Sequence, residues 1–112
     1  MRILVIEPLE KPYIKEIDGS LESMQKIVGG LIQAIYPYED KNVALICNEE
    51  AKLIGLPLNR ALYDDKGQIY DIIAGTFFLC QAPADSENFE SLTDEQINRY
   101  KEKYRQPEIY VR

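Results

Sequence analysis

The sequence predicts an α+β fold, in which a mixed, largely antiparallel sheet of about five or six strands carries one packed helix, a short helix and a C-terminal helix. Three observations lead to this fold class. Short runs rich in β-branched and aliphatic residues lie between proline and glycine turn signals, which is typical of strands. Two segments repeat apolar residues at helical spacing behind a residue that can cap a helix. Consecutive strand runs are close enough in the sequence to pair as antiparallel neighbours.

The N-terminal part of the chain predicts two paired strands. Residues 2–7 are rich in Ile, Leu and Val, which favours a strand buried on both faces. Residues 13–17 are the next candidate, and Pro8 and Pro12 in the segment between them interrupt pairing and indicate a loop. We therefore expect two antiparallel neighbours.

The first helix is predicted from a cap at each end. Asp18-Gly19-Ser20 supplies turn and N-cap chemistry. Gly29-Gly30 supplies a C-terminus, because glycine adopts the left-handed conformation without a Cβ penalty. Between these signals one apolar face recurs at helical spacing, formed by Leu21, Met24, Ile27, Val28 and Leu31.

The middle of the chain predicts a hairpin followed by a short helix. Residues 31–36 and 43–47 read as two strands that pair with each other, and residues 52–55 as a segment that pairs back briefly. Pro57 is well placed for the first turn of a short helix over residues 58–62.

A turn and a central strand are predicted next. Asp64-Asp65-Lys66-Gly67 is a strong turn signal that leads into a strand at residues 68–70. Residues 72–80 form the most hydrophobic segment, which favours one central strand, with Gly75 marking a bulge or a close backbone approach.

The C-terminal part predicts a linker and a second helix. Residues 93–104 fit a helix with a capping box made by Thr93 and Gln96, packed at the edge of the sheet. The predicted organisation is one domain: an α+β core at 1–80, an acidic linker at 81–91, and a C-terminal helix and tail at 92–112.

The composition limits which class of protein this chain can belong to and which partners it can bind. Lys and Arg number 13 against 19 Asp and Glu, a net charge of −6, so we expect no direct binding to nucleic acid. No apolar run approaches the roughly 20 residues that span a bilayer, and the start does not resemble a signal peptide. Cys47 and Cys80 fit buried, reduced thiols better than a single bridge. These features predict a cytoplasmic protein without a membrane partner.

Catalytic and metal-binding constellations are scarce in this sequence. The chain has no histidine, which removes the commonest general base, the commonest metal ligand and the Ser-His and Cys-His dyads. Two isolated cysteines do not make a structural zinc site, and the glycine spacing offers no phosphate-binding loop. We expect no catalytic residue, no metal and no cofactor.

Five residues remain as candidates for binding. Asn48 and Glu49 lie in a predicted turn, and Asp71 belongs to a group of carboxylates that could hold a cation but more often are simply solvated. Asn59 and Arg60 could form the polar rim of a small pocket, because arginine binds anions in a bidentate way. The structural alternative is an ion pair from Arg60 to Asp64, one helical turn later. Tyrosine is also favoured at interfaces, and the candidates are Tyr36, Tyr38, Tyr100, Tyr104 and Tyr110.

Four runs of the sequence carry a family resemblance, at residues 15–21, 46–50, 55–62 and 71–77. Together they resemble an uncharacterised domain-of-unknown-function family, DUF3846, of Gram-positive bacteria, their conjugative elements and phages. The resemblance covers Met1 to about Leu79 and is weaker in the acidic linker and the last helix. It implies an accessory protein of a mobile element or chromosome, and it transfers no catalytic residue because the family has no established activity.

Three functions follow as hypotheses. The first is a non-enzymatic module that binds another protein through the Asn48–Glu50 turn, the Leu56–Leu62 segment and nearby tyrosines. The second is an antirestriction-type DNA mimic, for which the five acids from Asp85 to Glu95 would form part of a carboxylate stripe. The third is a small-molecule-binding domain or enzyme with a concave site near Asn59 and Arg60. The oligomeric state is left open.

Overall fold

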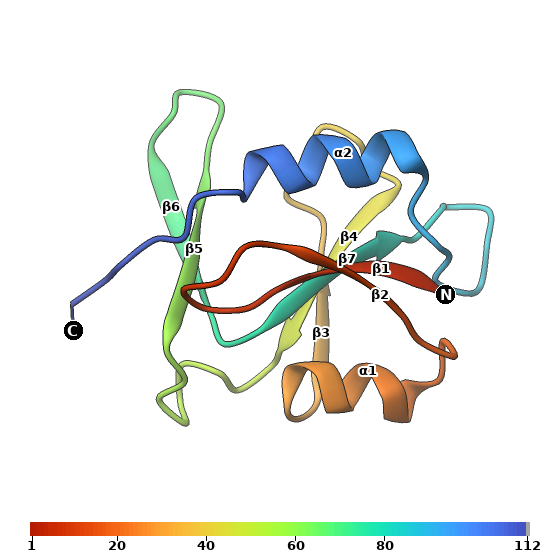
Figure 1. Ribbon diagram of the computed structural model, residues 1–112, viewed down its shortest axis with the longest axis horizontal. Coiled ribbons are helices and arrows are strands. Elements are labelled where there is room, and N and C mark those ends of the chain that lie inside the picture. Colours follow the sequence, from red (N-terminus) through yellow and green to blue (C-terminus); the bar gives the residue numbers. More distant parts are fainter. Residues whose placement is uncertain (112) are drawn as a thin grey trace.

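A five-stranded antiparallel sheet forms the centre of the protein, with one helix on each face (Figure 1). The computed structural model describes residues 1–111, so Arg112, the last residue of the predicted tail, lies outside the described residues. The order of the strands in the sheet is β2-β1-β7-β4-β3. Their bounds are β1 Arg2–Ile6, β2 Tyr13–Glu16, β3 Ile32–Ile35, β4 Val43–Asn48 and β7 Phe77–Gln81.

A separate two-stranded hairpin stands at one end of this sheet (Figure 1). It consists of β5, Leu58–Tyr63, and β6, Ile69–Ala74, which pair antiparallel. The α+β class and the antiparallel pairing are therefore confirmed, and the strands belong to two sheets, both of which are wholly antiparallel.

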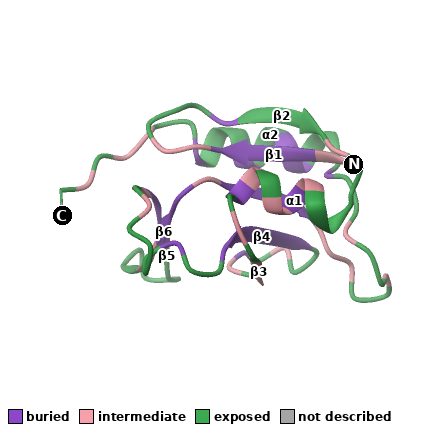
Figure 2. Cartoon of the chain, turned by 90° about the horizontal axis from the view of Figure 1, so that it is seen from below, coloured by how far each residue is buried: buried purple, intermediate pink, exposed green. Residues whose placement is uncertain are grey.

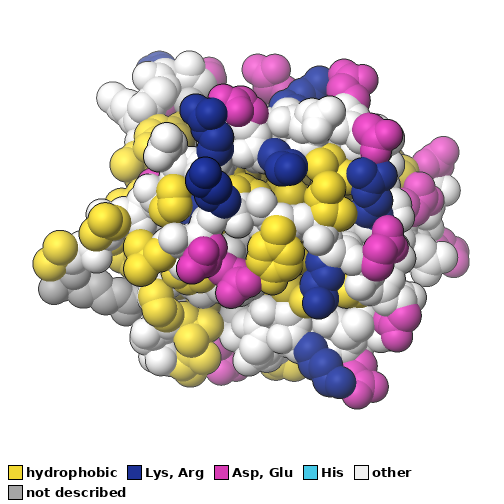
Figure 3. Space-filling model, in the orientation of Figure 1, with side chains coloured by type: hydrophobic (Ala, Val, Ile, Leu, Met, Phe, Trp, Pro, Cys, Tyr) yellow, Lys and Arg dark blue, Asp and Glu magenta, His cyan; other side chains and the backbone are white. Residues whose placement is uncertain are grey.

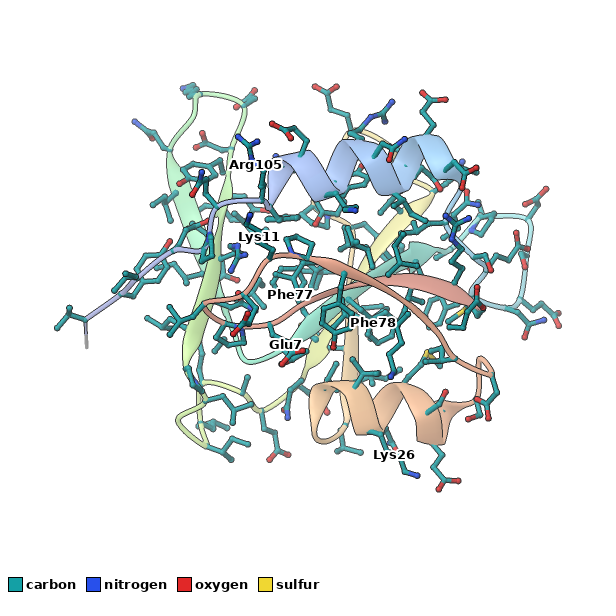
Figure 4. The ribbon with its side chains drawn as sticks, in the orientation of Figure 1. Glu7, Lys11, Lys26, Phe77, Phe78 and Arg105 are labelled. Carbon is teal, nitrogen blue, oxygen red and sulfur yellow. The ribbon has the colours of Figure 1, made fainter. Side chains whose placement is uncertain are left out.

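Both faces of the central sheet are buried, which explains why its inner strands are apolar along their whole length. All six residues of β4 are buried. The successive residues Phe77 and Phe78, labelled in Figure 4, belong to two different clusters, because neighbouring side chains of a strand point to opposite faces. Figure 2 shows the burial concentrated in β1 and β4, with β2 exposed at one edge.

The first helix, α1 (Leu21–Val28), begins and ends where the sequence predicts. The Ser20 side chain accepts a hydrogen bond from the Ser23 amide, and Gly29 has a left-handed φ of 79°. Met24 and Val28 pack onto the sheet face that carries Ile3, Val5 and Phe78. The predicted packed helix is confirmed.

The second helix, α2 (Asp94–Lys103), has the predicted capping box between Thr93 and Gln96. The expectation that it packs at the edge of the sheet is wrong. Ile97 and Tyr100 pack in the cluster that contains Leu4, Leu45 and Leu79, so α2 covers the sheet face opposite α1. An uncovered face would leave these side chains in water, and burial of a large aliphatic side chain is favourable by about 1.5–3 kcal/mol.

The predicted short helix at residues 58–62 is wrong, because this segment is strand β5. A helix of one or two turns gains little from local propensity, whereas pairing with β6 satisfies the backbone along the segment. The strand also rules out the predicted ion pair from Arg60 to Asp64, whose Oδ1 instead accepts hydrogen bonds from the Lys66 and Gln68 amides.

Two smaller predictions also need correction. The predicted strand at residues 72–80 is divided at Gly75 between β6 and β7. Gly75 has a φ of 76°, and a Cβ there would lie 2.8 Å from Leu56 Cδ1, so the predicted close approach is confirmed. Residues 52–55 form turns and pair with no strand.

Three of the predicted interface tyrosines lie in the core. Tyr38, Tyr100 and Tyr104 are buried, the Tyr38 and Tyr104 hydroxyls are 2.7 Å apart, and the Tyr38 and Tyr100 rings are 4.7 Å apart between centroids. Burial raises the pKa of Tyr38 and of Tyr104 well above the usual value of 10.0.

The buried tyrosines predict a loss of stability at alkaline pH. In the unfolded chain both hydroxyls ionise from about pH 10, whereas the folded chain keeps them protonated, so the free energy of unfolding falls by about 1.4 kcal/mol per pH unit for each group above that pH. Tyr38→Phe should make this fall shallower. Equilibrium unfolding in denaturant between roughly pH 8 and 11 measures both slopes, and equal slopes would contradict the prediction.

The two cysteines are buried and unpaired, as the sequence predicts. Cys47 and Cys80 are buried free thiols, and burial raises the pKa of Cys47 to about 11 and that of Cys80 to about 12. Among residues 1–111, no helix has the length and apolar character needed to cross a membrane.

Candidate functional site

Asn59 and Arg60 form a buried brace between the hairpin and the rest of the domain. Both side chains are 0% exposed. The Asn59 amide donates to Ile6 O and Gly75 O, each at 2.9 Å, and its oxygen accepts a bond of 2.8 Å from Arg60. The amide therefore ties β5 to the end of β1 and to the link between β6 and β7.

The guanidinium of Arg60 is held by backbone carbonyls instead of a directly bonded carboxylate. It donates to Glu10 O at 2.7 Å and to Tyr104 O at 3.0 Å. Tyr104 is the C-cap of α2, where the unpaired carbonyls carry the negative end of the helix dipole. Burial lowers the pKa of Arg60, and the nearby Glu108 carboxylate partly offsets this.

This brace places two predicted site residues out of reach of a ligand. The expected polar rim around Asn59 and Arg60 is not formed, because neither side chain is exposed and neither lines any of the cavities described below. Residues 59–62 are buried as well, so the Leu56–Leu62 segment offers little surface. The guanidinium donors that made Arg60 a candidate for anion binding instead form hydrogen bonds with Asn59 and with backbone carbonyls inside the protein.

Asn48, Glu49 and Asp71 come together around a small cavity between β4 and β6. The cavity has a volume of about 170 Å³ and is lined by these three residues with Cys47 and Lys52. Lys52 Nζ lies 2.5 Å from Asp71 Oδ1. Lys52 and Asp71 therefore neutralise each other, whereas Glu49 and Glu50, which also line the cavity, form no ion pair within residues 1–111.

Asn48 itself has a structural task in this cavity. Its side chain is buried, donates to Val28 O at 3.2 Å and accepts from the Glu50 amide at 2.8 Å. A Cβ on Gly30 would lie 2.9 Å from Asn48 Nδ2, which leaves no room for a side chain there. Asn48 thus joins the end of α1 to the turn that follows β4, and Glu49 remains exposed.

An open cleft lies between the tip of the β5–β6 hairpin, α2 and the loop between β3 and β4, which Figure 1 shows on the same side of the molecule. Its volume is about 790 Å³. Tyr63 and Tyr70 from the hairpin are 50% and 56% exposed, and both line the cleft. Tyr38 and Tyr100 contribute to its floor. We call this feature the tyrosine cleft.

Some charged side chains of the tyrosine cleft have partners within the chain, and others do not. Two of its acids have internal partners: Asp40 accepts from the Asn42 amide and the Gln96 side chain, and Asp64 accepts from its own turn. Its bases Lys41 and Lys103 form no ion pair within residues 1–111. Glu39 and Asp65 also line the cleft without an ion pair in the described part of the chain, so it presents unpaired charges of both signs beside exposed aromatic rings.

Tyr63 and Tyr70 were not among the candidates from the sequence. Tyr63 directly follows the segment predicted as a short helix, and Tyr70 lies in a brief predicted strand, so nothing local placed the two side chains on one cleft. The usable signal was the Asp64–Gly67 turn: a tight turn between two strands brings the residues on both sides of it close together.

The acidic segment Asp85–Glu95 is partly neutralised by its surroundings. Asp94 pairs with Arg2 at 2.7 Å, and Glu95 pairs with Arg99 at 3.2 Å. Figure 3 shows acidic side chains near this end of the molecule with Lys and Arg lying between them. No cluster of three or more acidic or cysteine side chains that could hold a metal occurs in the part of the chain that the structure describes.

Comparison with known proteins identifies a family for this chain. A family model described as a domain of unknown function matches residues 1–105. No curated protein and no solved structure matches the chain. The match extends across the acidic segment and α2, beyond the part of the sequence in which the resemblance is clearest.

Proposed function

We propose that this chain, which belongs to the DUF3846 family of unknown function, is a non-enzymatic module that binds another protein in the tyrosine cleft. The observation that carries the proposal is the pair of half-exposed tyrosines, Tyr63 and Tyr70, above a cleft of about 790 Å³. Aromatic residues in such a position supply large contact area with little loss of conformational entropy on binding.

The charges of the cleft suit a partner segment that carries both acidic and basic residues, because Glu39 and Asp65 line it without an ion pair among the described residues, as Lys41 and Lys103 do. Lys41 and Lys103 have no ion pair within residues 1–111, whereas Asp40 and Asp64 already accept hydrogen bonds from the chain itself. A carboxylate beside an apolar or aromatic side chain would pair with these lysines while its neighbour packs on the tyrosines.

Photo-crosslinking from the cleft tests this proposal. A photoreactive phenylalanine analogue replaces Tyr70 in the native host, and the same analogue replaces Tyr13 as the control, because Tyr13 is 40% exposed on β2 and does not line the cleft. We expect one defined protein to be crosslinked from position 70 and not from position 13. Lys103→Glu should abolish that crosslink, because it reverses a charge in the cleft.

Two outcomes would contradict the proposal. Equal crosslinking from positions 70 and 13 would show that the cleft does not select a partner. A crosslink that survives Lys103→Glu together with Tyr63→Ala would place the binding surface elsewhere. Circular dichroism of each variant confirms that these exposed substitutions leave the fold intact, as expected for side chains outside the core.

A second candidate function, binding of a small polar molecule, is supported by the cavity between β4 and β6. Three of the five residues predicted from the sequence, Asn48, Glu49 and Asp71, line it. Its volume of about 170 Å³ is below the roughly 300 Å³ at which ligand pockets usually begin, which favours the tyrosine cleft.

The ion pairs made by Asp94 and Glu95 weigh against the DNA-mimic hypothesis.

A further inference from the structure

Strand β3 forms an outer edge of the central sheet whose backbone groups are unpaired on one side. Figure 2 shows β3 beyond β4, with β2 at the far edge. The Glu49 amide donates to Leu31 O at 2.8 Å, so by antiparallel alternation Gln33 and Ile35 face β4. The N–H and C=O groups of Ile32 and Ala34 therefore point outward, and the same alternation continued one residue past the end of β3 gives those of Tyr36 the same direction. No hydrogen-bond partner for these backbone groups occurs within residues 1–111.

The two edges of this sheet differ in their chemistry. The β2 edge carries Lys15 and Glu16 and follows Pro12, which are features that discourage strand addition. Residues 31–36 along the β3 edge contain no charged residue and no proline. Leu31 and Tyr36 are also 55% and 48% exposed, so the ends of this edge are apolar as well. Only the β3 edge is suited to pairing with another strand.

We propose that β3 pairs with β3 of a second copy of this chain, antiparallel about a two-fold axis at Ala34, so that two five-stranded sheets become one continuous sheet. This interface lies on β3 and is independent of the tyrosine cleft. A neutral strand suits self-pairing, because a two-fold axis would place any charge close to its own copy.

The register follows from the outward-facing residues. With Ala34 opposite Ala34 of the second copy, Ile32 lies opposite Tyr36, and about six backbone hydrogen bonds form across the axis. The pairing of an aromatic with a β-branched side chain on one face is a favourable cross-strand combination. It also covers the exposed Tyr36 ring, which the monomer leaves in water. Shifting the register by two residues brings fewer of these groups into pairs.

The first test is the mass of the protein in solution. Sedimentation equilibrium over a range of concentrations should give twice the 12.9 kDa of the chain at the upper end. A protein that stays monomeric throughout overturns the proposal and leaves the β3 edge for a strand of a different protein.

The second test compares prolines at the two edges. Ala34→Pro removes an N–H that points away from β4, so the β3–β4 ladder survives, and proline is tolerated at such edge positions. Ile14→Pro is the matched control, because Ile14 is also outward-facing in β2 by the same alternation from the Ile17 to Met1 hydrogen bond. We expect Ala34→Pro to weaken dimerisation at least tenfold, roughly the effect of losing two or more hydrogen bonds, and Ile14→Pro to leave it unchanged. Equal effects of the two prolines overturn the proposal.

The third test does not depend on how well the proline variant folds. Ala34→Cys places two thiols on strands whose Cα atoms would be about 5.5 Å apart, which is within the range of a disulfide. Mild oxidation should link the two copies covalently, whereas Ile14→Cys should stay unlinked. The native Cys47 and Cys80 are buried and do not compete. Absence of the link in a folded Ala34→Cys protein overturns the proposed register.

Discussion

Replacing Arg60 by alanine is expected to lower the free energy of unfolding by about 3–5 kcal/mol, a large part of the stability of a small domain. The guanidinium is 0% exposed and donates to Glu10 O, Tyr104 O and the Asn59 side chain. Alanine removes these donors and leaves a cavity. The two carbonyls belong to the backbone, so no second substitution can remove them and restore the balance.

The matched control for Arg60 is Arg99, which is exposed on α2, forms an ion pair with Glu95 one turn earlier and contacts the Tyr100 hydroxyl. Such a pair contributes about 0.3–0.5 kcal/mol, so Arg99→Ala should change stability by no more than this. Urea unfolding followed by circular dichroism measures both variants. A loss below about 1 kcal/mol for Arg60→Ala would contradict the role of this side chain as a brace between the hairpin and α2.

Arg60→Lys separates charge from geometry. Lysine keeps a positive charge but offers a single ammonium group in place of a planar fork. It cannot reach Asn59 Oδ1, Glu10 O and Tyr104 O together as the guanidinium does. We expect the lysine variant to recover less than half of the stability lost in the alanine variant, because the carbonyls lie in different directions.

The elements defined by local chemistry were predictable from the sequence. Ser20 and Gly29 delimit α1, and Thr93 with Gln96 begins α2, because capping depends on residues within one turn of each other. The Asp64–Gly67 turn likewise depends on its own side chains. The paired N-terminal strands followed from their apolar runs.

Strand β5 was not predicted because the backbone groups that bind its polar side chains, at Ile6, Glu10 and Tyr104, are distant in the sequence. Its polar residues Asn59 and Arg60 break the apolar pattern that marks a buried strand. They are tolerated inside only because the carbonyls of Ile6, Glu10, Gly75 and Tyr104 surround them. A local reading therefore assigned these side chains to a surface, which is the usual position of Asn and Arg.

The tyrosine cleft escaped prediction for a related reason. Eight tyrosines in one chain can serve the core or an interface, and the sequence does not separate the two uses. Folding buries Tyr38, Tyr100 and Tyr104 and leaves Tyr63 and Tyr70 exposed above them. The cavity that gathers Asn48, Glu49 and Asp71 was only partly foreseen, because its wall from β6 depends on how the hairpin docks against β4.

Asn59→Ala is expected to lower the free energy of unfolding by about 2–4 kcal/mol, since a fully buried amide is lost and the Ile6 and Gly75 carbonyls lose a donor. Asn98→Ala, at an exposed position on α2, is the matched control and should be within about 0.5 kcal/mol of the native protein. Denaturant unfolding measures both variants.

The double variant decides whether Asn59 and Arg60 act as one unit. Because Arg60 donates to Asn59 Oδ1, removal of either side chain already breaks that bond, so the two losses should not add. We expect the double variant to be less destabilised than the sum of the two single variants by roughly 1 kcal/mol or more. Simple additivity would mean that the two side chains hold the hairpin independently, Asn59 against the sheet and Arg60 against the end of α2.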